Sequence, residues 1–236
     1  MRCKSMAFAI VAACSMLTAT LAEIAAAEEQ WGDLMGEFIY DGEPPTANMI
    51  AVNLPGVAPF PDESLIVDKK TGAIANVVVH LQATANKPVR PIHPDYEEVA
   101  LANPDAILNV LATGFDPHIL LMRNTQSIVV KNKTAFGVDV KIDSIRNQSK
   151  NLALAAGQSD FFNLEAEPFP LKVGSNIQPW YGGYVVVQDH PYMAKSGKDG
   201  RFEIKNLPVG TWTFHIGTRS REICKWSNEV AKKRSG

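Results

Sequence analysis

The sequence predicts a mainly β protein. Its 15 prolines and 16 glycines divide the chain into short segments. Several of these segments are rich in Val and Ile and are bounded by turn residues, which is typical of strands rather than of long helices. Residues 138–142 alternate apolar and polar side chains with the period of two that a half-buried strand requires. We therefore expect many short strands that pack as an antiparallel β-sandwich.

The first residues have the layout of an export signal. Arg2 and Lys4 precede an apolar run over residues 6–21, and the small residues 25–27 come just before Glu28. A positive region, an apolar region and a small-residue cleavage site in this order are typical of a secretory signal peptide. The apolar run is shorter than the roughly 20 residues of a membrane-spanning helix. We expect residues 1–27 to be removed, which leaves a periplasmic or secreted chain without a transmembrane segment.

The cysteines allow no internal disulfide after export. Cys3 and Cys14 lie in the signal, so the mature chain keeps only Cys224. Its stability must therefore come from packing. An alternative for the leader is that residues 11–14 resemble a bacterial lipobox, which would leave the chain anchored to a membrane by a lipid on Cys14.

Charge excludes one class of partner. The formal net charge is −2 at pH 7, and neither sign forms a long run. Nucleic acid is therefore not an expected partner.

In the N-terminal half of the chain, the first expected elements are short strands. Residues 36–40 read as a strand that enters a tight turn at Asp41-Gly42, and residues 64–67 and 75–81 are the next strands. The prolines at 88, 91 and 94 predict an extended loop. Residues 96–112 are expected to form a short helical turn followed by a strand.

Further along, consecutive strands are expected at 118–122, 126–131 and 138–142, and antiparallel pairing is the simplest way to join them. Strands are also expected at 184–187, 201–204 and 211–216, with a turn at 198–200. The tail 219–236 is charged and has no apolar face of any length, so we expect it to be loosely ordered.

A family resemblance rests on three stretches of the chain. They are residues 114–121, which read Gly-Phe-Asp-Pro-His-Ile-Leu-Leu, residues 129–132, which read Val-Val-Lys-Asn, and residues 172–181, which end in Asn-Ile-Gln-Pro-Trp-Tyr. The chain resembles the cupredoxin-like, methylamine-utilisation-like proteins of bacterial envelopes. The resemblance covers residues 31 to about 216 and implies a Greek-key β-sandwich with a type 1 copper site.

The same resemblance implies where the copper ligands would lie, and none of them is kept. The positions of the family's first His, Cys, second His and Met hold Val138, Ser175, Gln178 and Tyr181. A type 1 site needs a thiolate, two imidazoles and a weak axial group. Gly114 also stands where the relatives tend to have a cysteine. We expect a degenerate copper site that binds no metal.

Other chemistry is weakly indicated. The five histidines, at 80, 93, 118, 190 and 215, have no metal-motif spacing, and His118 and His190 are expected to play structural roles. The carboxylate pairs 97–98 and 165 with 167 are typical of a solvated surface. No nucleophile elbow, Walker glycine loop or His-Glu-x-x-His motif occurs. Trp180 and Tyr184 are expected to pack in the core rather than to display rings for a glycan.

The sequence therefore predicts four parts: a signal peptide at 1–27, a β-rich N-terminal portion at 28–95, a cupredoxin-like sandwich at 96–218 and a tail at 219–236. The expected function is that of an exported, non-enzymatic protein without a cofactor, which binds an envelope protein or a glycan. The alternative is a copper-binding electron-transfer protein with non-standard ligands. A fold alone does not decide between them, because function depends on the site.

Overall fold

The computed structural model describes residues 31–82, 89, 91–218 and 221–230 of the chain. The expected signal peptide, with Cys3 and Cys14, lies outside the described residues. The residues from Trp31 onward form one compact unit.

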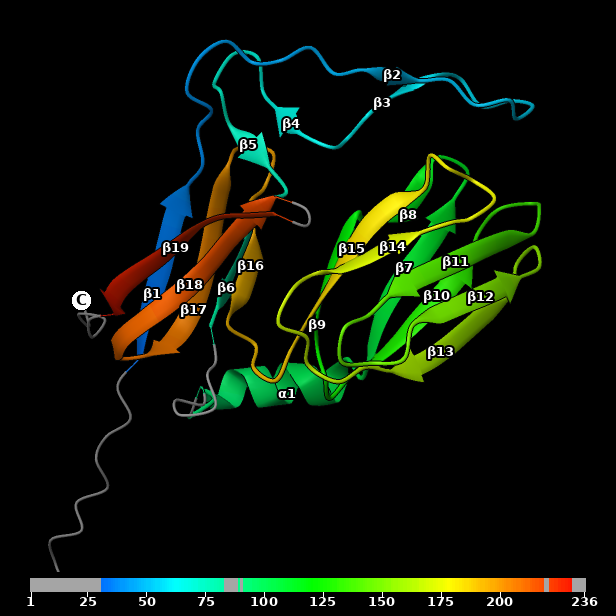
Figure 1. Cartoon of the computed structure of the whole chain (residues 1–236). Coiled ribbons are helices and arrows are strands. Elements are labelled where there is room, and N and C mark those ends of the chain that lie inside the picture. Colours follow the sequence, from blue (N-terminus) through cyan, green and yellow to red (C-terminus); the bar gives the residue numbers. More distant parts are fainter. Residues whose placement is uncertain (1–30, 83–88, 90, 219–220, 231–236) are drawn as a thin grey trace, which may run out of the picture. The chain divides into compact units, whose positions relative to one another are not determined.

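The middle of this unit is a β-sandwich, shown in green and yellow in Figure 1. One sheet has the strand order β13-β10-β7-β8, and the other has the order β12-β11-β14-β15-β9. The bounds are β7 Asp105–Leu111, β8 Gly114–Asp116, β9 Ile119–Arg123, β10 Ser127–Asn132, β11 Val138–Asp143, β12 Lys150–Leu154, β13 Ser159–Asn163, β14 Leu171–Gly174 and β15 Gly182–Gln188. The predicted fold class, a mainly β sandwich, is confirmed.

Strand pairing in the sandwich differs from the simplest expectation. The consecutive strands β9, β10 and β11 do not pair with one another, because β10 belongs to the four-stranded sheet and the other two to the five-stranded sheet. Most pairs are antiparallel, but β10 lies parallel to β7 and β15 lies parallel to β9. The chain thus crosses between the sheets after β9 and again after β10, which local sequence patterns do not reveal.

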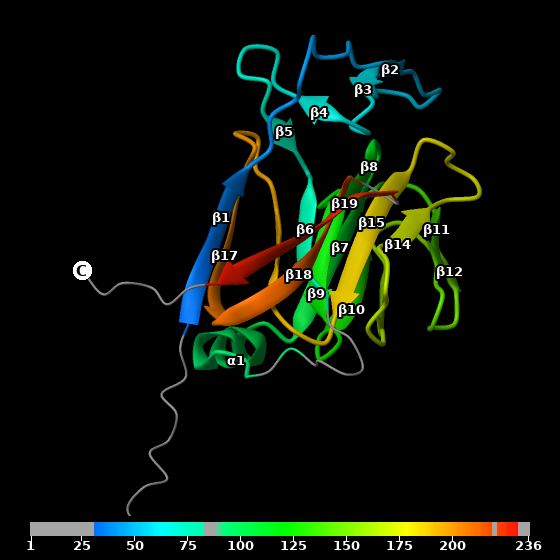
Figure 2. The same ribbon diagram turned by 60° about the vertical axis from the view of Figure 1, so that its left-hand side comes forward.

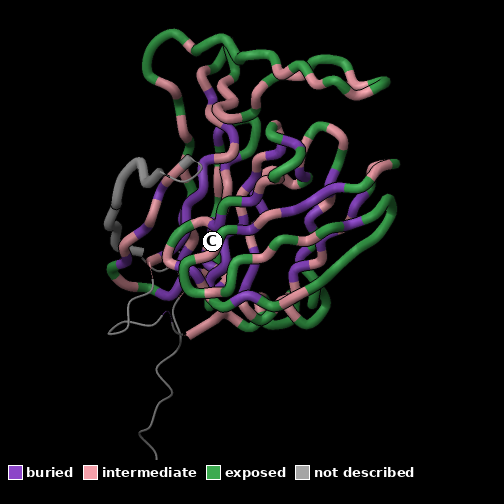
Figure 3. Tube along the Cα trace, turned by 45° about the vertical axis from the view of Figure 1, so that its right-hand side comes forward, coloured by how far each residue is buried: buried purple, intermediate pink, exposed green. Residues whose placement is uncertain are grey.

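The core of the sandwich follows from the period of two. On β7 the residues Ala106, Leu108 and Val110 are buried, and on the neighbouring β10 so are Ile128 and Val130. These side chains belong to one large apolar cluster between the two sheets. Burying an aliphatic side chain of this size contributes about 1.5–3 kcal/mol. Figure 3 shows the purple buried positions alternating with exposed ones along the strands.

A second group of strands is assembled from both ends of the described chain. Its sheets have the orders β1-β17 and β16-β6-β18-β19, and Figure 2 shows β1 beside β17 and β18 beside β6. We call this group the split region. Its bounds are β1 Trp31–Glu37, β6 Val78–Leu81, β16 Met193–Lys195, β17 Arg201–Pro208, β18 Gly210–Thr218 and β19 Arg221–Val230.

The split region changes the expected division of the chain. The sequence placed residues 96–218 in one sandwich, but β17 pairs with β1, and both β16 and β18 pair with β6. The segment after β15 therefore completes the N-terminal portion instead of extending the sandwich. A pairing partner more than 100 residues away leaves no local signal in either strand.

The expectation for the tail is also wrong in part. Residues 221–230 form β19, which pairs antiparallel with β18 from Gly210 to Thr218. Charged side chains are compatible with a strand at a sheet edge, where they oppose further pairing. The lack of an apolar face was therefore a poor guide to backbone order in this segment.

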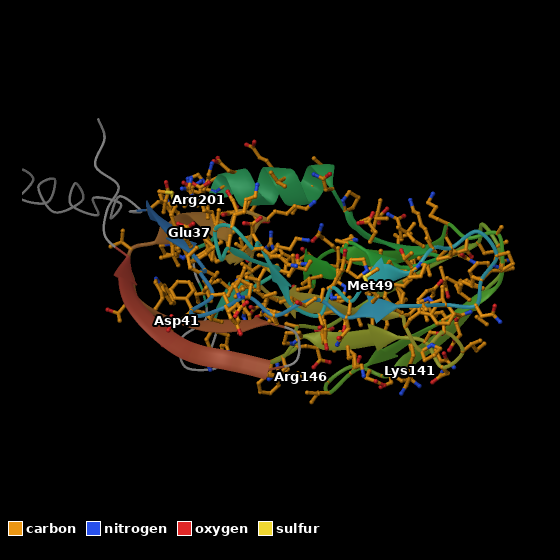
Figure 4. All side chains as sticks on the ribbon, turned by 90° about the horizontal axis from the view of Figure 1, so that it is seen from above. Glu37, Asp41, Met49, Lys141, Arg146 and Arg201 are labelled. Carbon is orange, nitrogen blue, oxygen red and sulfur yellow. The ribbon has the colours of Figure 1, made fainter. Side chains whose placement is uncertain are left out.

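The split region has its own core. Val77, Val79 and Leu81 pack with Phe214 and Tyr192, all buried. At the end of the β1–β17 pair, Glu37 lies opposite Arg201, and the two side chains are neighbours in Figure 4.

Shorter elements complete the unit. A segment between β1 and β6, mostly exposed or half-buried in Figure 3, carries two strand pairs. Their bounds are β2 Met49–Ile50, β3 Phe60–Pro61, β4 Ile66–Val67 and β5 Ile74–Ala75. The turn before β17 needs Gly200, whose φ is +78° and where a Cβ would lie 2.6 Å from the Phe38 carbonyl oxygen.

The expected helical turn is α1, Pro94–Ala102. The helix begins at Pro94 and not at residue 96, where the sequence predicted it. Proline is tolerated in the first turn of a helix, because the N–H that it lacks would have no partner there. His93 caps it by accepting a hydrogen bond from the Asp95 amide. Arg123, at the end of β9, donates to both carboxylate oxygens of Glu97 at 3.2 and 3.3 Å. Among the described residues, no helix has the length and apolar character needed to cross a bilayer.

Candidate functional site

The four positions that the resemblance assigned to copper ligands gather at one end of the sandwich. Ser175 and Gln178 lie on the loop after β14, with 2.6 Å between Ser175 Oγ and Gln178 Oε1. Val138 begins β11, and Tyr181 directly precedes β15. Both are buried in the sandwich core. The structure thus separates the four residues into a polar pair and an apolar pair.

A carboxylate that the sequence analysis did not single out organises this loop. Asp139 accepts hydrogen bonds from the Ser175 hydroxyl, from the backbone and side-chain nitrogens of Asn176 at 2.8 and 2.9 Å, and from the Ile177 amide at 3.1 Å. The Gln178 amide in turn donates to Ser175 Oγ at 2.9 Å. We call Asp139 and residues 175–178 the loop clamp. Its hydrogen bonds hold the loop after β14 against β11.

The charge of Asp139 is stabilised within the clamp. Burial raises the pKa of Asp139, but the hydrogen bonds from Ser175, Asn176 and Ile177 together outweigh it and hold the pKa below its ordinary value. Asp139 therefore stays ionised at neutral pH. The Ser175 hydroxyl has one proton, which it can donate either to Asp139 or to the side-chain oxygen of Gln178.

Tyr181 does not act as a polar group in this arrangement. Its hydroxyl is buried and has no hydrogen-bond partner among the described residues. Burial raises the pKa of Tyr181 to about 12, so its phenolate form does not arise near neutral pH. The ring packs edge-on against Phe115 at 5.4 Å between centroids. Tyr181 fills core volume.

These residues do not fit a type 1 copper ion. Val138 has no donor atom, Ser175 and Gln178 offer neutral oxygens, and the Tyr181 oxygen is protonated. Copper of this type requires soft sulfur and imidazole nitrogen. The donors present are moreover already engaged with one another in the loop clamp.

The histidines are placed as follows by the structure. Among the residues that it describes, no group of three or more His, Cys, Asp or Glu side chains is placed to hold a metal ion. The sequence nevertheless hid one spatial relationship: His80 and His215 lie opposite each other on β6 and β18. His190 is fully buried and hydrogen-bonded to the Leu81 carbonyl oxygen, in keeping with its expected structural role.

A second buried carboxylate corrects the surface assignment of Glu167. This residue is only 2% exposed. Its Oε1 accepts hydrogen bonds from the backbone amides of Ile145, Arg146 and Asn147 and from the Asn147 side chain, at 2.8 to 3.2 Å. Burial raises the pKa of Glu167, but these hydrogen bonds together lower it below the ordinary value. Glu167 thus anchors the loop between β11 and β12, and Glu97 is likewise engaged, with Arg123.

Trp180 and Tyr184, which were expected in the core, are partly buried and pack against apolar clusters. Trp180 packs against the sandwich core and donates from Nε1 to the Ala112 carbonyl oxygen at 3.1 Å. Tyr184 packs against a small apolar cluster formed by Val78, Ile119 and Val186. A cavity of about 160 Å³ lies beside Trp180, well below the roughly 300 Å³ at which ligand pockets begin.

Comparison with known proteins gives structural likeness alone. No family model and no curated protein matches the chain. A purple cupredoxin from Nitrosopumilus maritimus is 18% identical, with a TM-score of 0.32, and the match covers 36% of this chain and 100% of that one. A Cu(I) structure of a mutant amicyanin is 15% identical, with a TM-score of 0.31 and coverages of 36% and 82%.

The copper-containing nitrite reductase of Thermus scotoductus is 14% identical, with a TM-score of 0.32, and the match covers 45% of this chain and 25% of that one. These matches cover less than half of this chain at low TM-scores, so its function must be argued from its own residues. The residues that carry that argument are those of the loop clamp, of which sequence reasoning found Ser175 and Gln178 and missed Asp139. The signal that could have found it is a carboxylate on β11 directly beside the first expected ligand position.

Proposed function

We propose that this chain is an exported, cupredoxin-like binding module that works without copper and is not an enzyme. The observation that carries the proposal is the loop clamp. Where the resemblance implies a metal that ties two loops together, Asp139 makes four hydrogen bonds to residues 175–177. Hydrogen bonds to the Asp139 carboxylate therefore hold the loop in place of a metal ion.

A catalytic role for Ser175 is not supported by its surroundings. Its hydroxyl is bonded to a carboxylate and lies against an amide. A serine becomes a nucleophile when a general base such as His removes its proton, and Asp139, with its lowered pKa, is a poor base. A structural role in the clamp accounts for all of its contacts.

A protein partner suits this end of the sandwich better than a glycan. Ile177, at the tip of the clamped loop, is 70% exposed, while the backbone on either side is held by Asp139 and Ser175. An exposed apolar side chain on a fixed loop can anchor in a partner with little loss of conformational entropy. Sugar stacking needs an accessible aromatic ring, whereas Tyr181 is buried in the core and Trp180 is partly buried against it.

Copper titration of two proteins tests the proposal. The purified chain and a Val138→His, Ser175→Cys, Gln178→His, Tyr181→Met variant are each incubated with Cu(II), and metal content and visible absorption are measured. We expect the wild type to remain colourless and metal-free, and the variant to gain an intense thiolate-to-copper band. Stoichiometric copper in the wild type would contradict the proposal and favour electron transfer through non-standard ligands.

The wild-type result stands even if the variant does not fold. A Ser175→Ala chain provides the matched control, because it removes the clamp hydroxyl without adding a ligand. It should bind no more copper than the wild type.

A further inference from the structure

Two histidines pair on one face of the split region, and a third is hydrogen-bonded to the same strand, β6. His80 on β6 pairs in register with His215 on β18, and their rings are parallel, with 5.1 Å between centroids and 6° between planes. His190 follows β15 and donates from Nε2 to the Leu81 carbonyl oxygen at 2.9 Å. We call His80, His190 and His215 the histidine seam. His80 and His190 are 5% and 0% exposed.

The seam lies where the split region contacts the sandwich. Side chains alternate on a strand, so His80 points to the face opposite Val79 and Leu81, which belong to the core of the split region. Val78 shares the face of His80 and packs with Ile119 of β9 and Val186 of β15. On the neighbouring strand, Lys195 of β16 donates from Nζ to the Ile119 carbonyl oxygen at 3.0 Å.

The hydrogen bonds of His190 require the neutral ring. Its Nε2 donates to Leu81, and its Nδ1 accepts from the Tyr192 amide at 3.2 Å. A neutral imidazole carries one proton and can do both, whereas the charged form has a proton on each nitrogen and cannot accept. Protonation of His190 therefore breaks the bond to Tyr192 just where the chain passes from β15 to β16.

The charges around the seam do little to offset further positive charge. Asp189 adjoins His190 and favours its charged form, while Arg123 opposes it. Arg123 is paired with Glu97, and Lys195 interacts with Asp116. The charged form of His80 is disfavoured by repulsion from His215 and His190.

Burial lowers the pKa of His80 to about 4, and repulsion from His215 and His190 acts in the same direction. Burial likewise lowers the pKa of His190 to about 4. A group whose folded pKa lies below its unfolded value of 6.5 contributes its full stability above 6.5 and loses it as the pH falls toward 4.

We propose that the histidine seam is an acid-sensitive joint, whose protonation loosens the split region from the sandwich while each keeps its own core. The two cores are separate apolar clusters, and the cluster of Val78, Ile119 and Val186 between them is small. Repulsion between two charged imidazole rings, together with loss of the His190–Tyr192 hydrogen bond, should weaken this small cluster before either large core.

Amide hydrogen exchange on the purified full chain tests this at about pH 7.5 and about pH 5, which bracket the start of the transition expected below 6.5. After correction for the intrinsic pH dependence of exchange, we expect faster exchange at the lower pH in β6, β16 and residues 189–193. Protection in β7, β10 and β11 should persist, and the change should reverse on return to the higher pH.

Variants keep the test specific. His80→Gln and, because His215 is less buried, His215→Gln should each shift the opening to lower pH, because each variant removes one imidazole of the repelling pair. The control is His93→Gln, which removes a histidine outside the seam, where it caps α1 and packs against Trp31, and it should leave the opening pH unaltered. Unchanged exchange at the lower pH, simultaneous loss of protection in both cores, or an opening that ignores the seam variants would each overturn the proposal.

Discussion

The sandwich and the split region each bury an apolar core of their own but are assembled in different ways. The sandwich is built from one continuous stretch between β7 and β15, and its loops are fixed by two carboxylates, Asp139 and Glu167. The split region joins strands from both ends of the chain, and histidines line its contact with the sandwich. The difference teaches that charge stabilises the loops of one region, while the joint of the other depends on rings that stay neutral.

The largest expected effect comes from core truncation in each region. Phe214→Ala in the split region should cost about 3–5 kcal/mol, and Ile142→Ala in the sandwich about 2–5 kcal/mol, because both side chains are fully buried. Since the described chain forms one compact unit, urea denaturation at neutral pH should show a single transition that either variant shifts. Two transitions, each moved by only one variant, would break the comparison in favour of independent regions.

The next effect separates the loop clamp from ordinary surface charge. Asp139→Ala removes the acceptor of the Asn176 amide and one of the two acceptors of the Ser175 hydroxyl and of the Ile177 amide, which should cost about 2–3 kcal/mol. Asp143→Ala on the same strand is the control, because Asp143 makes only a half-exposed pair with Lys141 and should change stability by less than about 1 kcal/mol. Urea midpoints of both variants measure this. Equal losses would mean that the clamp does not stabilise the fold.

The sequence predicts the parts of this molecule unevenly. It finds strands with strong local patterns such as β6, β10, β11 and β15, because buried Val and Ile with turn residues at either end are a local signal. It misses the pairing of β1 with β17 and of β6 with β18, since neither strand encodes its distant partner. At the candidate site the sequence finds Val138, Ser175, Gln178 and Tyr181. It misses Asp139, because the alternating pattern of β11 assigns this residue to the solvent-facing side of the strand.

Acid should reveal the anchoring carboxylate of the sandwich. The folded pKa of Glu167 lies below its ordinary value of 4.5, so its contribution is present above 4.5 and is lost as the pH falls through the folded pKa. Glu167→Gln removes this titration, and the slope of unfolding free energy against pH below about 4.5 should be shallower than in the wild type. The exposed Glu165→Gln should keep the wild-type slope. An unchanged slope in Glu167→Gln would show that the hydrogen bonds from residues 145–147 do not favour the charged form.

The smallest effect compares two tyrosines. Tyr181→Phe removes a buried hydroxyl with no hydrogen-bond partner among the described residues and should be neutral or stabilise the chain by up to about 1 kcal/mol. Tyr96→Phe removes a hydroxyl that donates to the Lys205 carbonyl oxygen at 2.8 Å and should cost about 1 kcal/mol. Thermal unfolding of the two variants checks the sign. A clear loss in Tyr181→Phe would mean that this hydroxyl serves the site after all.

The central claim is that the loop after β14 is held by Asp139 and needs no metal. Amide exchange at Ile177 and Gln178, measured after treatment with a chelator and again after addition of Cu(II), tests it directly. The account predicts that both amides are protected without metal, that copper adds nothing, and that Asp139→Asn weakens the protection. Amides that exchange freely without metal and become protected when copper is added would contradict it.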